Sequence, residues 1–176
     1  MDVCYARFVD DAEDPGWTAP ALRHWAPDVP GYRSSEVSAS IGHGAEQWTR
    51  AATDILRWRV KTASGFLVGG TADPPRVIPG QRQVITARVL GVTVTEPVEV
   101  VRVVDDPDRV GFSYRTLPGH PVAGEEAFIV ERDGGEVRIV VRSLTRAAPQ
   151  QPWRALFPVL LVAQRVAKRR YLRALR

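Results

Sequence analysis

The most extended hydrophobic pattern in the chain is an alternation of valine, isoleucine and threonine with polar residues between Val77 and Thr145. A period of two with recurring turn signals is typical of β-strands. Asp105-Asp106-Pro107-Asp108 and Asp133-Gly134-Gly135 mark two connections, and Glu96-Pro97 should break another run because proline cannot donate within a central ladder. Since the connections are short, the pattern predicts five or six antiparallel strands in a meander.

Segments of helical period lie on both sides of this region. One apolar stripe is formed by Trp48, Ala51, Ala52, Ile55 and Leu56, and it should end near Trp58 because Arg59 would point into the core. A weakly alternating segment, Ser34–Ile41, precedes the stripe and can form a strand. Trp153–Leu175 predicts a long C-terminal helix, with a kink or a new start at Pro158.

The C-terminal helix is expected to be apolar on two sides. Its main stripe contains Leu160 and Gln164, while Val159, Val162 and Val166 form a ridge on the opposite side. Three exposed valines would leave an apolar patch, so the ridge needs a cover. The N-terminal arm is the nearest candidate, and a second subunit of a homodimer is the other.

We divide the chain into an irregular N-terminal arm, residues 1–29, and one domain, residues 30–176. The arm is rich in proline, shows no period, and contains Trp17 and Trp25, which should pack on the body of the domain. The order strand, helix, antiparallel strands and long helix indicates an α+β fold in which the terminal helix fills one face of the sheet. An ordinary α+β sandwich with a filled core is the alternative.

Four motifs carry a resemblance to a known family. They are Pro30-Gly31-Tyr32-Arg33, Val104-Asp105-Asp106, the run Gly111-Phe112-Ser113-Tyr114-Arg115-Thr116-Leu117-Pro118-Gly119-His120-Pro121, and Gly124-Glu125-Glu126-Ala127-Phe128. With them, residues 30–175 resemble uncharacterised protein family 0548, within the START and polyketide-cyclase superfamily. The resemblance implies a helix-grip (START-like) fold, in which a curved antiparallel sheet wraps around a long C-terminal helix and leaves a cavity between them. It implies no particular activity.

Composition narrows the class of protein. The chain has 176 residues, of which 44% are hydrophobic and 25% charged, as expected for a globular domain and not for a disordered chain. The single cysteine, Cys4, excludes an internal disulfide and a cysteine-based zinc site. The longest apolar run, from Leu156 to Ala163, is too short to span a bilayer. The acidic N-terminus does not resemble a secretory signal, so we expect a cytoplasmic protein without a transmembrane segment.

The net charge of +4 is unevenly distributed along the chain. Residues 147–176 contain seven bases and no acid, and most of these bases cluster at the end: Arg165, Lys168, Arg169, Arg170, Arg173 and Arg176. Such an end could bind an acidic partner, a nucleic acid or an anionic membrane. We favour a solvated helix end that complements the helix dipole. Nucleic acid is not favoured, because no basic strand carries interleaved aromatic residues.

The segment from Tyr114 to Glu126 has the highest density of chemically active groups. In an enzyme, His120 could act as general base, Glu125 or Glu126 could orient its ring, and Tyr114 or Arg115 could stabilise an oxyanion. We favour a structural interpretation of this segment. It predicts that Arg115 pairs with Glu125 or Glu126, and that His120 hydrogen-bonds its own loop.

The leading hypothesis is a domain that binds a small apolar or amphipathic molecule in an apolar cavity between the sheet and the C-terminal helix. The candidate binding residues are Phe112, Tyr114, Arg115, His120, Phe128, Leu160 and Gln164. Gln164 would meet either a polar ligand or water, and Lys168 should reach solvent. A hydrolase-like or cyclase-like cavity enzyme using His120, and an interaction module using the basic helix end, are the alternatives.

No cofactor or metal is expected. The three histidines, His24, His43 and His120, lie far apart in the sequence without the spacing of metal ligands.

Overall fold

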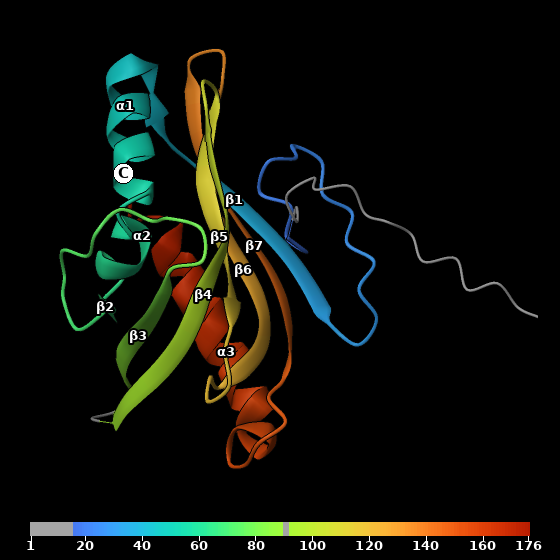
Figure 1. The fold of residues 1–176 in the computed structure, drawn as a ribbon. Helices are drawn as coiled ribbons and strands as arrows, with labels where there is room; N and C mark the ends of the chain where they lie inside the picture. The colour runs from blue at the N-terminus through green and yellow to red at the C-terminus, as the bar shows by residue number, and fades with distance from the viewer. Residues whose placement is uncertain (1–15, 90–91) are drawn as a thin grey trace, which may run out of the picture.

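A computed structural model describes residues 16–89 and 92–176 (Figure 1). Its strands are β1 (Arg33–His43), β2 (Leu67–Val68), β3 (Arg82–Val89), β4 (Val92–Asp106), β5 (Arg109–Thr116), β6 (Val122–Asp133) and β7 (Glu136–Ala147). Its helices are α1 (Gly44–Ile55), α2 (Arg59–Thr62) and α3 (Trp153–Tyr171). Within the described residues, the strands form one seven-stranded sheet in the order β1-β7-β6-β5-β4-β3-β2.

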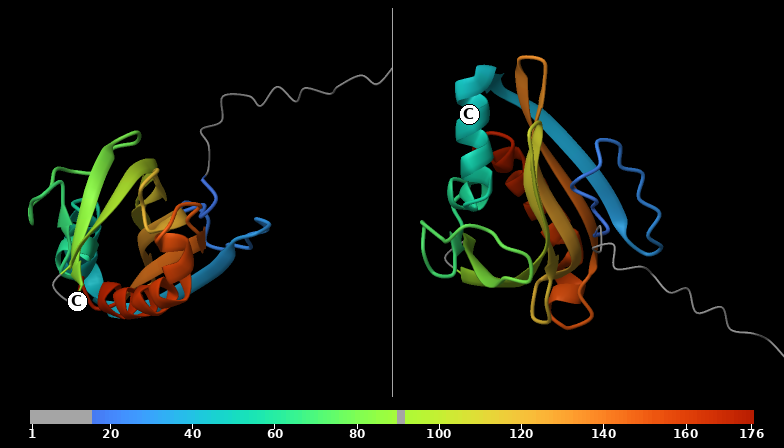
Figure 2. Two further views of the ribbon diagram at one scale, coloured as in Figure 1. Left: turned by 90° about the horizontal axis from the view of Figure 1, so that it is seen from below. Right: turned by 45° about the horizontal axis from the view of Figure 1, so that its top comes forward.

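The predicted meander is confirmed, since β3 to β7 lie side by side in chain order and every neighbouring pair is antiparallel. The first strand completes the sheet by pairing with β7. The sheet curves around α3, as the two views in Figure 2 show. This architecture is the helix-grip arrangement that the resemblance implies, and the α+β class is confirmed.

The sheet has an inner face toward the helices and an outer face. On the inner face, Phe112 of β5, Phe128 of β6 and Val141 of β7 are fully buried and lie in register across three neighbouring strands. They belong to one hydrophobic core together with residues of α1 and α2 and the C-terminal end of α3, including Tyr171. Period-two alternation places the intervening residues of the same strands, such as Arg142, on the outer face.

The expected break at Pro97 is wrong, because β4 continues through it. Pro97 pairs with Val84 of β3, and its carbonyl oxygen accepts a hydrogen bond from the Leu117 N–H at the end of β5. The N–H and C=O of a strand residue point to the same side, so the missing donor also faces β5. The ladder between β4 and β5 begins only at Val98, so the proline removes none of its bonds.

The described part of the N-terminal arm, residues 16–29, does not cover the second ridge of α3, which corrects the expectation for that part. Residues 16–25 lie against the outer face of the sheet, where Arg142 donates to the carbonyl oxygens of Thr18, Ala19 and Arg23. Val159, Val162 and Val166 stay 63%, 57% and 45% exposed. The outer face of the sheet carries buried charged side chains that need backbone hydrogen-bond partners, and the arm supplies them. The valine ridge of α3 carries no such side chains. The part of the arm before residue 16 lies outside the described residues.

Candidate functional site

Polar side chains form a row across the inner face, immediately beside the hydrophobic core. Tyr114 of β5 is in register with Glu126 of β6, which is in register with Ser143 of β7. The hydroxyl of Tyr114 donates to Glu126 Oε2 over 2.5 Å. Because the neighbouring row on the same face contains Phe112, Phe128 and Val141, the inner face changes from apolar to polar within two residues along each strand.

Lys61 of α2 enters this row from the opposite layer. Its side chain is only 2% exposed, and Nζ lies 3.2 Å from Glu126 Oε2 and 2.7 Å from the Tyr171 hydroxyl of α3. The same ammonium group lies 4.6–5.2 Å from the ring centroids of Phe66, Tyr114, Phe128 and Tyr171. Four aromatic rings and one carboxylate therefore surround a single buried cation.

The electrostatics keep this pair ionised. Burial acts to lower the pKa of Lys61, but Glu126 together with Tyr114, Tyr171 and Glu96 outweighs burial, and the pKa lies well above its usual value. Burial likewise acts to raise the pKa of Glu126, while Lys61 and the Tyr114 hydroxyl bring it below its usual value. Since Lys61 stays protonated at neutral pH, it is a fixed cation and not a free amine nucleophile.

Two further charged groups lie at the edge of the row. Burial raises the pKa of Glu96 on β4, and the charge of Lys61 opposes that shift. Burial lowers the pKa of Lys168 on α3, and Glu126 opposes it. Both groups thus experience the field of the Lys61–Glu126 pair.

Trp58 shapes this part of the site. It follows α1 with a left-handed backbone, φ 59° and ψ 13°, which is a strained conformation for a bulky residue. This turn ends α1 and begins α2, so that Lys61 points inward. The ring packs against Phe112 with 4.7 Å between the centroids, and its Nε1 is buried without a hydrogen-bond partner among the described residues.

The first half of α3 faces the sheet without joining the core. Trp153, Phe157, Leu160 and Leu161 lie on the side of the helix that carries Tyr171, yet they are only partly buried and lie outside the core cluster. The helix is continuous through Pro158, so the proline does not begin a new one. The contacts of α3 with the core are therefore concentrated at its Tyr171 end, and the inward side chains at its Trp153 end stay partly exposed.

Two polar residues of α3 bridge to β7 between these ends. Gln164 Nε2 lies 3.3 Å from Thr145 Oγ1, and Lys168 Nζ lies 2.7 Å from Ser143 Oγ. The expectation that Lys168 reaches solvent is wrong, because the polar row on the sheet offers its ammonium group a hydroxyl acceptor and the Glu126 charge. Both side chains line the interior that the sequence assigned to a ligand.

Two of the predicted site residues lie away from this interior. Arg115 is 54% exposed and pairs with Glu99 at 2.6 Å, so its predicted pairing with Glu125 or Glu126 is wrong. Neighbouring strand residues alternate between faces, so Arg115 and Glu125 lie on the outer side while Tyr114 and Glu126 point inward. Glu125 accepts hydrogen bonds from the backbone N–H groups of Trp17 and Thr18 and from the Thr18 hydroxyl.

His120 serves its own loop, as the structural interpretation predicts. Its Nδ1 accepts a hydrogen bond from the Val122 N–H at 3.1 Å. Burial, with a smaller effect of the Lys61 charge, lowers its pKa to about 4, so the ring is neutral at pH 7. The Nδ1 lone pair is occupied and the proton resides on Nε2, an arrangement that does not suit a general base.

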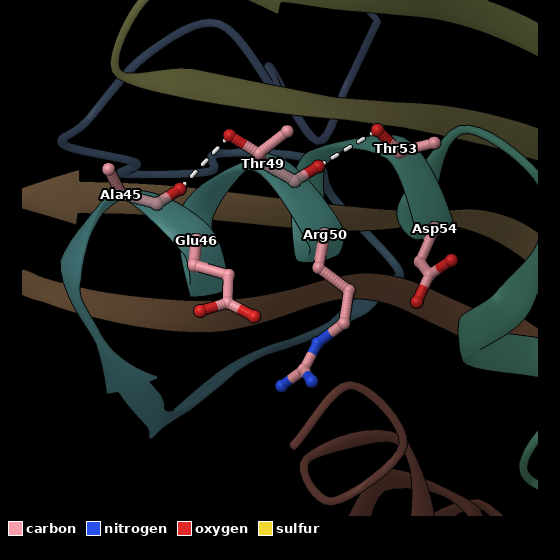
Figure 3. Close-up of a pocket in the computed structure, with 6 residues that line it drawn as sticks. All are labelled: Ala45, Glu46, Thr49, Arg50, Thr53 and Asp54. Atoms are coloured by element: carbon pink, nitrogen blue, oxygen red, sulfur yellow. Dashed lines mark hydrogen bonds between the residues drawn. The ribbon is translucent and has the colours of Figure 1, made fainter.

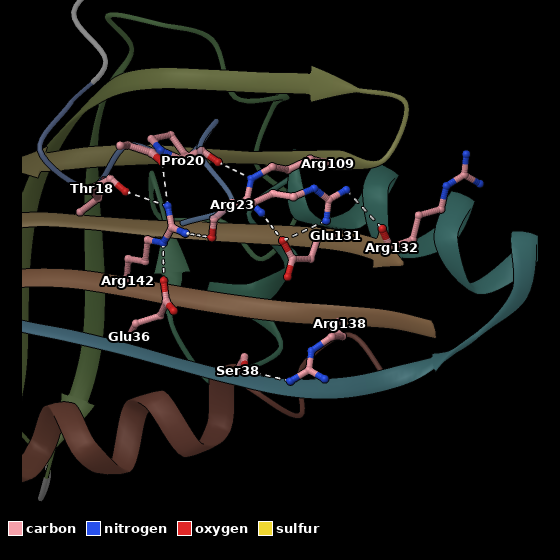
Figure 4. Close-up of polar contacts among 11 residues, drawn as sticks. Thr18, Pro20, Arg23, Glu36, Ser38, Arg109, Glu131, Arg132, Arg138 and Arg142 are labelled. Carbon is pink, nitrogen blue, oxygen red and sulfur yellow. Dashed lines mark hydrogen bonds and ion pairs between the residues drawn. The ribbon is translucent and has the colours of Figure 1, made fainter. Parts of the chain in front are cut away.

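The outer face carries a separate network that holds the arm (Figure 4). Arg142 is 1% exposed and bonds Glu36 of β1 at 2.7 Å in addition to the arm carbonyls. Arg109 pairs with Glu131 and donates to the Pro20 carbonyl oxygen at 2.6 Å. Most of these charged groups pair with one another or with backbone carbonyls, although Arg109 Nη2 is buried without a hydrogen-bond partner among the described residues. This pairing indicates a structural role for the network.

The pockets found on the described surface lie elsewhere. One lies on the exposed side of α1 and is lined by Ala45, Glu46, Thr49, Arg50, Thr53 and Asp54 (Figure 3). There the hydroxyls of Thr49 and Thr53 already donate to backbone carbonyls of their own helix. A second pocket lies between α1 and the turn joining β4 and β5. Neither adjoins the polar row.

The described residues contain no group of side chains arranged to hold a metal ion. Among the helices of the described part, none is long and apolar enough to cross a membrane.

Sequence reasoning missed several members of the site, namely Lys61, Glu96, Ser143, Thr145 and the hydroxyl of Tyr171. One feature of the sequence could have singled out Lys61, since it is one of two lysines among 24 basic residues. The inward direction of Lys61 depends on the left-handed turn at Trp58, and the sequence does not indicate that turn because no glycine or asparagine occurs there.

The fold and this interior define a class, a helix-grip protein with a polar row beneath the gripped helix. A family described as a domain of unknown function (DUF1990) matches residues 13–174. A protein described as UPF0548 protein, from Deinococcus radiodurans, is 34% identical over 153 residues, which cover 81% of this chain and 76% of the relative. The chain therefore belongs to the DUF1990 (UPF0548) family, and the resemblance seen in the sequence is confirmed.

Solved structures agree on the fold. A protein from Thermus thermophilus is 16% identical with a TM-score of 0.55, covering 81% of this chain and 94% of that one. A protein from Arthrobacter aurescens is 12% identical with a TM-score of 0.53, covering 81% and 85%. A hypothetical protein from Helicobacter pylori is 15% identical with a TM-score of 0.50, covering 82% and 89%. At these identities the likeness concerns the fold alone.

Proposed function

We propose that the protein binds a small amphipathic molecule between the sheet and the first half of α3. The observation that carries the proposal is the partial exposure of that half: Trp153, Phe157, Leu160 and Leu161 face the sheet but stay partly exposed and outside the core. Apolar side chains that face the interior without being fully buried can gain further van der Waals contacts from a bound ligand.

The proposed ligand has an apolar body and a polar end. The helix side offers aliphatic and aromatic groups, whereas the sheet side offers the hydroxyls of Thr145 and Ser143. Lys168 is a partly buried ammonium group that donates to Ser143 Oγ, and Gln164 can turn its amide to a ligand. A carboxylate or another anionic group suits these donors best, since it would pair with the Lys168 charge.

The binding step needs no chemistry from His120, Arg115 or Glu125. His120 is occupied by its loop, and the other two point to the outer side. Of the residues expected to bind a ligand, the proposal keeps Leu160, Gln164 and the edge of Tyr114. Phe112 and Phe128 belong to the packed core behind the row.

The test is equilibrium binding of laurate and of uncharged lauryl alcohol to the full chain, followed by tryptophan fluorescence and calorimetry. Laurate should bind more tightly than the alcohol. Leu160→Trp should weaken laurate binding by at least about tenfold by filling the space, a change of about 1.4 kcal/mol. The matched control is Val159→Trp, the same substitution one residue away on the exposed side, which should bind as the parent does. Absence of binding, or equal effects of the two variants, would overturn the proposal.

A further inference from the structure

The outer side of α3 carries an apolar stripe that nothing in the described chain covers. Leu156, Val159, Val162 and Val166 are 41%, 63%, 57% and 45% exposed. At 100° per residue these four positions fall within about a third of the helix circumference. The three valines point away from Tyr171, which faces the sheet, and Leu156 lies at the border of their side of the helix. On that side of the molecule α3 forms the outermost layer (Figure 2).

Positive charge borders this stripe and continues it. Arg165 and Arg169 flank the stripe along the helix, and Arg170 and Arg173 extend it beyond Val166; all four are exposed. Residues 147–176 contain seven basic residues and no acid, so no acid of the same segment neutralises them. The surface is therefore an aliphatic strip that ends in a dense cationic patch.

The charge distribution decides between possible occupants. A second copy of the chain would bring its own arginines against these, without an acid in the segment to pair with them, and like charges would repel. A protein partner usually binds through aromatic or arginine anchors seated in pockets, but the exposed apolar groups here are four aliphatic side chains on the outer side of one helix. A surface that combines anionic charge with a shallow apolar layer fits both features.

We propose that the outer side of α3 docks on an anionic lipid surface, with its axis in the plane of the membrane. The valines and Leu156 insert into the boundary between headgroups and acyl chains, and Arg165, Arg169, Arg170 and Arg173 contact lipid phosphates and carboxylates. The helix has 19 residues, about 28 Å at 1.5 Å per residue, and lies on the bilayer without crossing it.

The experiment is flotation of the full chain with vesicles of phosphatidylcholine alone and of phosphatidylcholine containing about one third phosphatidylserine. The chain should float with the anionic vesicles at low salt, and binding should fall as salt screens the charges. Each basic residue near such a surface contributes about fivefold in partition, so Arg165→Gln/Arg169→Gln should weaken binding about 30-fold. The control pair Arg57→Gln/Arg88→Gln removes the same charge elsewhere and should retain most of the binding.

A second pair of variants tests the apolar stripe. Val162→Asp should abolish flotation, whereas Leu22→Asp should not, although the two parent side chains are similarly exposed at 57% and 56%. Both positions are at the surface, so both variants should keep the parent melting curve. Failure to float with anionic vesicles would overturn the proposal and leave an acidic protein as the occupant. Equal losses in variants and controls would also overturn it, as would a dimer that Val162→Asp dissociates.

Discussion

At the scale of single residues, the site depends on Lys61, a cation buried among four aromatic rings and one carboxylate. Lys61→Met should destabilise the protein by about 3–5 kcal/mol, because Glu126 would remain buried with only the Tyr114 hydroxyl as a partner. Urea unfolding measures the change.

The double variant Lys61→Met/Glu126→Gln is the control for that prediction. It removes both charges, so it should be more stable than Lys61→Met alone, and the cycle should report a coupling of at least about 1 kcal/mol. Additive effects of the two substitutions would mean that the pair is not coupled in solution.

His120 makes stability depend on pH. Its pKa falls from 6.5 in the unfolded chain to about 4 in the folded protein, mainly through burial. Because the unfolded state binds the proton more readily, the stability from neutral His120 is complete above pH 6.5 and is lost as pH falls toward 4. The loss amounts to about 3 kcal/mol. Lys61 reinforces the shift, and Glu126 and the Val122 N–H oppose it.

The measurement is urea unfolding of the parent and of His120→Asn between pH 4 and 7. Asparagine keeps an acceptor for the Val122 N–H but does not titrate, so the variant should lose much less stability on acidification. His24→Asn, at an exposed histidine, should follow the parent curve. Parallel curves for the parent and His120→Asn would contradict the assignment.

Sequence alone identified some residues of the site and missed others for a local reason. Tyr114 and Glu126 could be selected because polar groups in a valine-rich meander are conspicuous. Strand alternation places Tyr114 and Glu126 on the opposite face of the sheet from Arg115 and Glu125. Which of these faces is the inner one depends on where the helices pack, and the sequence does not give that. Lys61 could not be placed from the helical pattern, since the left-handed turn at Trp58 breaks that pattern without a glycine.

At the scale of elements, the strands and long helices were predictable because period and turn signals agree. Two motif glycines have a steric reason in the sheet: a Cβ at Gly111 would collide with the Phe128 carbonyl oxygen, and one at Gly124 would collide with that of Leu144. The course of the arm could not be predicted. Its tryptophans indicate that it packs, but the partners that hold it, Arg142 and Glu125, look like ordinary surface charges in the sequence.

The arm should therefore stabilise the sheet from its outer face. Deleting residues 1–29 should lower the melting temperature by several degrees, because Glu125, Arg142 and Arg109 lose backbone partners contributed by residues 17–23. For a domain of this size each 1 kcal/mol corresponds to about 2–4 °C. Thermal unfolding of this truncation beside one that lacks only residues 1–15 isolates the described part of the arm. Identical melting curves for the two truncations would show that these contacts are not stabilising.

At the scale of the whole molecule, packing is uneven along α3. The core joins the sheet, α1, α2 and the Tyr171 end of α3, and on β6 and β7 it ends at the polar row. Beyond that row the helix is held by Gln164, Lys168 and partly buried apolar contacts. The interior under α3 thus has two halves. One is buried around the Lys61–Glu126 pair, and the other, where α3 is partly exposed, is where the proposed ligand binds.

This unevenness should appear in the local stability of one continuous helix. Amides of α3 between residues 156 and 163 should exchange with solvent at least about tenfold faster than those between residues 166 and 171, because less buried contact opposes their opening. Native-state hydrogen exchange by NMR measures both segments in one sample. Laurate should slow exchange in the first segment and leave the second nearly unchanged, since only the first faces the loosely packed interior. Uniformly slow exchange along α3 would contradict the division into two halves, and protection that laurate leaves unaltered would place its binding elsewhere.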